Sequence, residues 1–162
     1  MTRILVMSDS HGDESGLREL LREVWQQTGP IDAYFHLGDG ARDFQRLDKL
    51  IWTRDPQAVR LGVKGNCDLG MDLPERLIRR VGPWRVMLTH GHRYHVKDTC
   101  DVLEDDAWAE ECDIALFGHT HIPYRRQGLV LLVNPGSVMD GSAALITGDR
   151  ESGPSVRLLH FG

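Results

Sequence analysis

Histidine, aspartate and asparagine side chains recur in this 162-residue chain in short clusters that follow apolar stretches. Asp9 and His11 come directly after the run Ile4–Met7. The other members of the set are Asp39, Asn66, His90, His119 and His121. Carboxylate, carboxamide and imidazole groups are oxygen and nitrogen donors for divalent cations. So many donors suit two divalent metal ions better than one.

The elements that must position these donors alternate between strand-like and helix-like patterns. Hydrophobic periodicity predicts a helix at Glu14–Gln27 and another at Arg42–Trp52, and each lies between two strand-like runs. The predicted strands are Arg3–Ser8, Ala33–Leu37, Ala58–Lys64, Leu77–Val81, Arg85–Thr89, Ile114–Phe117, Leu129–Val133, Ala143–Thr147 and Val156–His160, with a further helix around Asp98–Glu110. The order predicts an α/β fold in which two mixed β-sheets pack together and helices lie outside.

Each donor cluster lies just after a predicted strand. Loops that leave the carboxyl ends of neighbouring parallel strands converge at one edge of a sheet, which is where ligands bind in open α/β folds. A glycine precedes three of the donors, at Gly38, Gly65 and Gly118, and permits a tight backbone turn there. Any one cluster also fits a helix cap, a turn or a structural histidine. Five clusters together favour a metal site.

Composition excludes several other classes of protein. The length and the hydrophobic content of 41% predict a single domain over residues 1–162. A net charge of −5 argues against nonspecific nucleic-acid binding, and no apolar run is long enough for a membrane span. Cys67, Cys100 and Cys112 form no paired framework, so we expect a reducing, cytoplasmic compartment.

Five short motifs resemble those of one known family in their order. They are Asp9-Ser-His11, Gly38-Asp39, Gly65-Asn66-Cys67-Asp68, His90-Gly-His92 and Gly118-His119-Thr-His121. The sequence is similar to the calcineurin-like metallophosphoesterases, in their small single-domain prokaryotic phosphodiesterase branch. The resemblance runs from Ile4 to about Val138 and includes the segment Asn134-Pro-Gly-Ser137.

The resemblance implies a ligand set and a reaction. It makes Asp9, His11, Asp39 and His121 ligands of one metal ion. Asp39 would bridge to a second ion, held also by Asn66, His90 and His119. Among divalent ions the oxygen and nitrogen donors favour Mn²⁺, with Zn²⁺, Fe and Ni²⁺ as the other candidates. A hydroxide between the two ions would attack phosphorus, with Asn66 and His90 orienting the phosphoryl group.

Cys67 and Asp68 complete the expected catalytic residues. Many members of the wider family have histidine where this chain has Cys67, and that histidine is implied to protonate the leaving group or to contact phosphate. The thiol is either a weak substitute or a small filler. Asp68 either orients a neighbouring ligand or caps a loop.

Two further histidines and one segment are not assigned to the ligand set. His36 is expected to be packed or to support a ligand, and His92 could orient one. The segment Arg93–Lys97 either overhangs the site or is a solvated loop.

These observations predict a dinuclear metal-dependent phosphodiesterase acting on a small phosphate ester. Two alternatives stay open. One is a phosphomonoesterase, or a nucleotide or cyclic-nucleotide hydrolase, at the same site. The other is a non-catalytic protein-binding scaffold of the same fold, similar to a retromer subunit. The sequence leaves the substrate, the metal, the general acid and the formation of homo-oligomers open.

Overall fold

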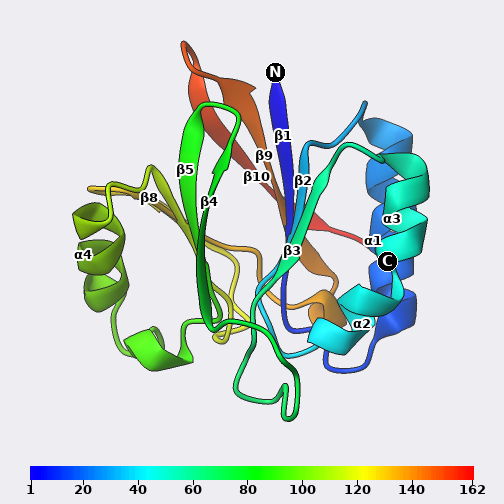
Figure 1. Ribbon diagram of the computed structural model, residues 1–162, viewed down its shortest axis with the longest axis horizontal. Coiled ribbons are helices and arrows are strands. Elements are labelled where there is room, and N and C mark those ends of the chain that lie inside the picture. The colour runs from blue at the N-terminus through cyan, green and yellow to red at the C-terminus, as the bar shows by residue number, and fades with distance from the viewer.

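The computed structural model describes residues 1–162, which form two five-stranded β-sheets with helices on their outer faces (Figure 1). The strands of sheet A are, in spatial order, β10 (Gly153–His160), β9 (Ser142–Asp149), β1 (Thr2–Met7), β2 (Ala33–His36) and β3 (Val59–Gly62). Those of sheet B are β4 (Arg76–Val81), β5 (Trp84–Thr89), β6 (Ile114–Leu116), β8 (Leu131–Asn134) and β7 (Tyr124–Gln127). Both sheets mix parallel and antiparallel pairs, which confirms the predicted fold class.

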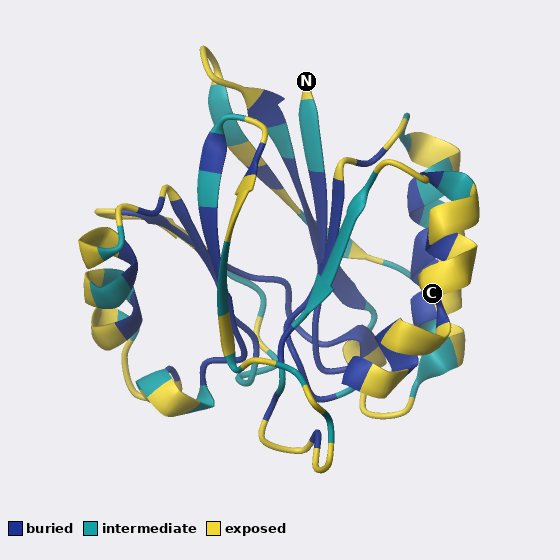
Figure 2. Cartoon of the chain, viewed as in Figure 1, coloured by how far each residue is buried: buried dark blue, intermediate teal, exposed yellow.

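Helices cover the outer face of each sheet, so the layers follow the order helix, sheet, sheet, helix (Figure 1). The helices beside sheet A are α1 (Glu14–Gln27), α2 (Ala41–Arg46) and α3 (Asp48–Arg54), and α4 (Asp101–Ala109) lies beside sheet B. Figure 2 shows that the helices expose their outer faces and bury the faces turned toward the sheets. None of them combines the length and the apolar composition that a membrane span requires.

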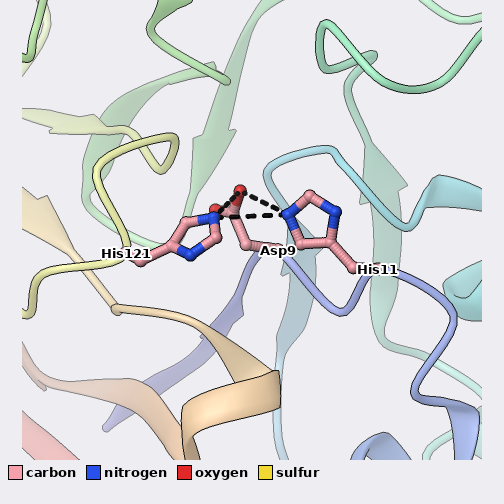
Figure 3. Close-up of side chains that lie close together, drawn as sticks. All are labelled: Asp9, His11 and His121. Carbon is pink, nitrogen blue, oxygen red and sulfur yellow. Dashed lines mark hydrogen bonds and ion pairs between the residues drawn. The ribbon is translucent and has the colours of Figure 1, made fainter.

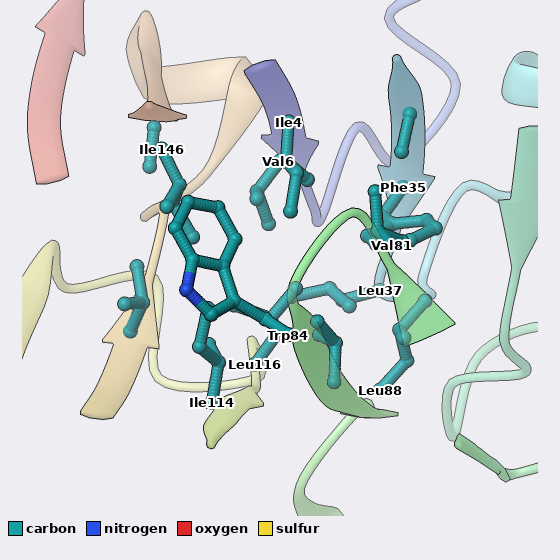
Figure 4. Packing of buried hydrophobic residues seen from close by; sticks show 14 of the residues in the cluster. Ile4, Val6, Phe35, Leu37, Val81, Trp84, Leu88, Ile114, Leu116 and Ile146 are labelled. Atoms are coloured by element: carbon teal, nitrogen blue, oxygen red, sulfur yellow. The ribbon is translucent and has the colours of Figure 1, made fainter. Parts of the chain in front are cut away.

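Strand β1 is buried on both faces because each face meets a different layer. Ile4 and Val6 point between the two sheets, whereas Leu5 and Met7 point toward the helices beside sheet A. This alternation follows from the two-residue period of a strand. In the core between the sheets, the indole of Trp84 packs among aliphatic side chains (Figure 4). Burial on both faces fixes the direction in which β1 delivers the residues that follow it.

Helix α1 has the predicted bounds because its ends carry strong capping groups. The side chain of Asp13 accepts a hydrogen bond of 2.9 Å from the backbone N–H of Gly16, which satisfies one free donor of the first turn. The buried face consists of Leu17, Leu20, Leu21 and Val24, as the periodicity predicts.

Two predictions about elements were wrong. The single helix predicted at Arg42–Trp52 is two helices, because the N–H of Leu47 bonds the carbonyl of Phe44 three residues back and redirects the chain. The edge strand β7 was not predicted at all. Its residues Tyr124-Arg-Arg-Gln127 are mostly exposed and polar, so they lack the alternation that indicates a strand.

Strand register aligns the carboxyl ends of the central strands. In sheet A, Met7 of β1 lies beside His36 of β2, which lies beside Gly62 of β3. In sheet B, β5, β6 and β8 are parallel in the same way. The loops that leave these strand ends meet at one edge of the sandwich, at the bottom of Figure 1. This edge holds the predicted ligands.

Candidate metal centre

Four loops bring six of the predicted ligands together at this edge. They follow β1, β2, β5 and β6, and they carry Asp9, His11, Asp39, His90, His119 and His121. Donor atoms of these residues form two groups of three, and within each group all atoms lie within 4.8 Å of one another. The two groups come from both sheets, so the site exists only where the sheets pack together.

The first group is Asp9, His11 and His121 (Figure 3). His121 Nε2 lies 3.1 Å from Asp9 Oδ1 and 3.2 Å from His11 Nε2, and His11 Nε2 lies 3.6 Å from Asp9 Oδ1. Atoms that each bind one cation at about 2.0–2.2 Å lie roughly 3.0–3.6 Å from each other. The three measured separations agree with that range, so the group can hold a divalent ion without rearrangement.

The second group is Asp39, His90 and His119. His90 Nε2 lies 3.2 Å from Asp39 Oδ2 and 3.2 Å from His119 Nδ1. Asp39 Oδ2 is also 3.8 Å from His11 Nε2, so this oxygen faces both groups. A carboxylate between two sets of imidazoles is the arrangement that a bridging ligand requires.

Each carboxylate has one oxygen engaged by the protein and one directed at the donors. Asp9 Oδ2 accepts hydrogen bonds from Ser8 Oγ at 2.5 Å and from His119 N at 3.1 Å, whereas Asp9 Oδ1 is buried without a hydrogen-bond partner. Asp39 Oδ1 accepts a hydrogen bond of 2.7 Å from the N–H of Cys67. An unpartnered buried carboxylate oxygen is costly in water-free surroundings, and a cation would satisfy it. The residues therefore fit a metal ion.

Strained backbone marks the same residues. Seven residues other than glycine have positive φ, and five of them are Asp9, His11, Asp39, His119 and His121. Such conformations cost about 1 kcal/mol or more each and persist where the surroundings hold them, most often at functional sites. The fold thus holds these side chains in positions that the local chain would not choose.

The charges in the centre favour a cation between the two carboxylates. Burial acts to raise the pKa of Asp39, but its hydrogen bond with His90 and the charge of His90 lower that pKa well below its ordinary value. Burial acts to lower the pKa of His90, but the hydrogen bond to Asp39 and the charges of Asp9 and Asp39 raise it above 6.5. Both shifts thus favour a positive charge next to Asp39 and Asp9.

Asn66, the seventh predicted ligand, lies in the loop that follows β3. It is exposed, and its amide nitrogen contacts Cys67 Sγ at 3.5 Å.

Cys67 Sγ itself lies within 4.8 Å of donor atoms of His11 and Asp39. Partial desolvation and the charge of Asp39 raise the pKa of the Cys67 thiol, so it is protonated at neutral pH. A cavity of about 320 Å³ opens here, over His11, Asp39 and Cys67, with Arg42 on its wall.

The contacts of Asp68 are those of a positioning residue. Its two oxygens accept four backbone hydrogen bonds, from the N–H groups of Asp39, Gly40, Ala41 and Gly65, at 2.7–3.1 Å. Burial acts to raise the pKa of Asp68, and these hydrogen bonds lower it below the ordinary value. Both sequence-based interpretations describe its contacts, since Asp68 caps the loop and also holds the backbone N–H of the ligand Asp39. Asp68 ties the loop after β2 to the loop after β3.

His36 performs a similar task behind the centre. Its Nδ1 accepts a hydrogen bond of 3.2 Å from the N–H of Gly38, so Nε2 carries the proton and donates to Ser10 Oγ at 3.0 Å. Ser10 in turn donates to Asp43 Oδ2 at 2.8 Å. The ring is fully buried and stacks on Phe44, and it joins the loops that carry the first three ligands. This confirms the expectation of a packed histidine.

The sequence analysis assigned no task to Asn134 and Ser137, yet both hold the site. Asn134 Nδ2 donates to the carbonyl of Gly118 and to Thr120 Oγ1, each at 2.9 Å, and Ser137 Oγ donates to the carbonyl of Asp9 at 2.8 Å. The last residue of β8 and the segment after it therefore hold Gly118 and Thr120, on either side of His119, and the backbone of Asp9. The signal was present as the motif Asn134-Pro-Gly-Ser137, but its partners lie far away in the chain.

Two of the glycines are required by close packing at the centre. A Cβ at Gly65 would overlap the carboxylate of Asp39, and one at Gly118 would overlap the side chains of Ser8 and Asp9. The sequence analysis predicted tight backbone turns at Gly38, Gly65 and Gly118, but of these three only Gly38 has a positive φ, of 99°, and close packing is what requires the other two.

The segment Arg93–Lys97 divides between the two interpretations given to it. Arg93 is exposed and pairs with Glu75 at 2.9 Å, away from the donors. The ring centre of His92 lies 5.4 Å from that of His90 and 6.2 Å from that of His119. Lys97 lines a second cavity, of about 510 Å³, that also includes Thr120. Within the segment Arg93–Lys97, Arg93 is thus in a solvated loop, whereas Lys97 lies in the wall of a cavity next to Thr120.

A family model of the calcineurin-like phosphoesterase superfamily domain matches residues 2–149. The chain belongs to this family. It is 34% identical over 139 residues to the probable metallophosphoesterase YsnB of Bacillus subtilis, a match that covers 83% of this chain and 74% of YsnB. The resemblance drawn from the five motifs is confirmed.

Solved structures agree. A conserved protein of Streptococcus pneumoniae described as a predicted phosphoesterase is 33% identical, with a TM-score of 0.77 over 98% of this chain and 89% of that one. Two more distant structures share the fold. One is an archaeal phosphodiesterase (20% identity, TM-score 0.74, covering 99% and 100%), and the other is Vps29 of Entamoeba histolytica in complex with zinc (21%, 0.71, 99% and 100%). Family membership implies a phosphoric ester hydrolase with bound metal.

Proposed function

We propose that the protein is a dinuclear metal-dependent phosphodiesterase that hydrolyses a small phosphate diester. The observation that carries the proposal is the pair of donor groups on either side of Asp39, whose Oδ2 is 3.2 Å from His90 and 3.8 Å from His11. The proposal of a diester is supported by the family branch that the motifs resemble and by the archaeal phosphodiesterase of the same fold.

We propose the following division of the ligands between two metal ions. Asp9, His11 and His121 would hold one ion, Asn66, His90 and His119 would hold the other, and Asp39 would bind both. His90 Nδ1 donates a hydrogen bond of 2.8 Å to the carbonyl of Leu37, so the lone pair of Nε2 faces inward once His90 loses its second proton. Two bound divalent ions neutralise charge on the phosphoryl oxygens and make water more acidic. We propose Mn²⁺, on the oxygen and nitrogen donors of the two groups.

Hydrolysis of a diester forms one P–O bond from water and breaks the P–O bond to one alcohol, which leaves with a proton. His90 is fully buried and both of its ring nitrogens are engaged, so we now assign it to ligation alone. We assign orientation of the phosphoryl group to the exposed Asn66, beside the cavity that Arg42 lines. Cys67 carries a protonated thiol there, which is a weak proton donor to the leaving oxygen.

The test uses metal-reconstituted protein with bis(4-nitrophenyl) phosphate and 4-nitrophenyl phosphate, which release the same phenolate. We expect kcat/KM for the diester to exceed that for the monoester by at least about tenfold. Asp39→Ala should be inactive on both esters, and Asp72→Ala, at an exposed position, is the matched control. Preference for the monoester would support the phosphomonoesterase alternative.

The scaffold alternative is favoured by the likeness to Vps29, which concerns the fold alone. Absence of hydrolysis by protein with full metal content would support it over the enzyme. A reducing, cytoplasmic location is proposed from the cysteines alone, since all three are unpaired. Formation of homo-oligomers remains a prediction.

A further inference from the structure

A cavity of about 510 Å³ lies beside the metal centre, between the segment 96–100 and the segment 117–126. Its volume is in the range of pockets that bind small molecules, about 300–1,000 Å³. No residue of the two donor groups lines it, so it is separate from the site described above.

The cavity has an apolar side and a polar side. Phe117 and Val96 are buried in its wall, and the ring of Tyr124 meets Phe117 edge to face at 6.2 Å between centres. The side chain of Ile122 is exposed at 65% beside them. The polar lining residues are Lys97, Asp98, Thr99, Thr120 and Arg126. Such a lining suits a ligand with both a flat apolar face and hydrogen-bonding groups.

Two polar groups of the lining are free to bind a ligand. Arg126 already pairs with Glu104 at 3.3 Å, but Lys97 makes no ion pair or hydrogen bond in this structure. Thr120 Oγ1 accepts hydrogen bonds from Asn134 at 2.9 Å and from the N–H of Ile122 at 3.1 Å, so its own O–H remains available as a donor. A cation and a hydroxyl donor are therefore unused in a partly apolar cavity.

The cavity adjoins the metal centre directly. Thr120 lies between His119 and His121 in the chain, one residue from each donor group. A substrate with its phosphoryl group at the centre could therefore extend its organic group past Thr120 into the cavity.

We propose that this cavity binds the organic group of the phosphodiester substrate, and that this group is a nucleoside. The inference rests on the proposed function and adds the substrate class to it. A nucleoside offers a flat base for the apolar side, and its sugar hydroxyl groups and base nitrogen and oxygen atoms can accept hydrogen bonds from the unused Thr120 hydroxyl and Lys97 ammonium groups. A methyl group would leave the cavity unfilled, and a lipid chain would leave its polar groups unpaired.

The first experiment compares two diesters that release the same 4-nitrophenolate. They are thymidine 5′-(4-nitrophenyl) phosphate and methyl 4-nitrophenyl phosphate, assayed with metal-loaded protein. We expect kcat/KM to be at least about tenfold higher for the thymidine ester, because the base is removed from water in the cavity. The ratio of the two values is the readout, so differences in metal content between preparations cancel. A ratio near one would overturn the proposal.

Two variants test whether the cavity is responsible. Thr99→Trp fills it and Ile122→Ala removes apolar wall, and each should lower the ratio, by about tenfold and about threefold respectively. The matched controls lie at exposed positions outside the cavity: Thr53→Trp on α3 repeats the first substitution, and Leu129→Ala between β7 and β8 removes an aliphatic side chain of the same size as Ile122. The controls should keep the wild-type ratio. An unchanged ratio in both cavity variants would contradict the proposal even if one of them folded poorly.

A binding measurement separates this proposal from the proposed function. Thymidine 5′-monophosphate and methyl phosphate are titrated calorimetrically into metal-loaded protein, and we expect at least about tenfold tighter binding of the nucleotide, lost in Thr99→Trp. If neither diester is hydrolysed but this difference in affinity is found, the proposed function fails and the nucleoside site stands. If both diesters are hydrolysed equally and both phosphates bind equally, the nucleoside site fails and the phosphodiesterase stands.

Discussion

Asp68 Oδ2 accepts a hydrogen bond of 2.7 Å from the backbone N–H of Asp39, 29 residues earlier in the chain. Asp68, the last residue of the motif Gly65–Asp68, thus holds the backbone of Asp39, the ligand that faces both donor groups. Because three further N–H groups bond the same carboxylate, its removal would leave four donors without their acceptor.

Asp68→Ala should therefore destabilise the protein by about 3 kcal/mol, since hydrogen bonds to charged groups contribute more than neutral ones. Asp68→Asn keeps one carbonyl oxygen and should cost less. Urea unfolding of the metal-free chain measures both, with the exposed Asp72→Ala as the matched control on the same loop. Equal stability of Asp68→Ala and Asp72→Ala would contradict the positioning task assigned to Asp68.

Metal content should depend on Asp39 more than on any other ligand. Asp39→Ala should lose both ions, because Oδ2 faces both donor groups, whereas His121→Ala should retain partial occupancy of the group around His90. Elemental analysis after dialysis gives the metal-to-protein ratio of each variant. Full metal content in Asp39→Ala would exclude the bridging assignment.

Chelation should lower the melting temperature. Ions that bind only the folded chain add about 2.7 kcal/mol at a free concentration of one hundred times Kd, and they would also satisfy the unpartnered Asp9 Oδ1. Melting curves with and without a chelator measure the effect, and Asp39→Ala should show no such difference. A wild-type melt that is unchanged after confirmed loss of metal would count against the site.

The metal-free protein should lose stability as the pH falls below 6.5, in part through His36. Burial lowers the pKa of His36 from 6.5 to about 4. Above pH 6.5 the ring is neutral in both states, so its contribution is fully present. Between about 6.5 and 4 the unfolded chain takes up a proton that the folded chain does not, and stability falls by up to about 1.4 kcal/mol per pH unit.

The measurement is the urea unfolding free energy at pH 7, 6 and 5 in the presence of a chelator. His36→Gln should reduce the slope, whereas the same substitution at the exposed His160 should leave it unchanged. A slope that is the same in His36→Gln and wild type would refute the assignment of a neutral buried ring.

Cys67 gives a prediction about leaving groups. With a protonated thiol as the neighbouring side chain, rates should fall steeply as the pKa of the leaving alcohol rises. Cys67→His should raise turnover of poorly activated diesters by up to roughly 10²-fold, if position 67 delivers the proton. Phenyl and alkyl diesters, assayed with both proteins at equal metal occupancy, give the plots. Parallel plots of log rate against leaving-group pKa would show that position 67 does not deliver the proton.

The sequence determined those features that depend on neighbours in the chain. The bounds of α1 followed from the Asp13 cap and the spacing of its apolar residues, and the placement of Asp9 after a doubly buried strand followed from the run Ile4–Met7. The five motifs were sufficient to identify the family, because each consists of neighbouring residues at the end of a strand and can be recognised in the sequence alone. Local patterns carry this information without any knowledge of packing.

Only the tertiary structure decided which polar groups meet. Arg93 and Lys97 are both exposed cations in one segment, yet one is paired with Glu75 and the other lines the cavity beside Thr120. Long-range partners depend on how two sheets pack face to face, and no short stretch of sequence specifies that geometry. The supporting contact from Ser137 to Asp9, across 128 residues, has the same origin.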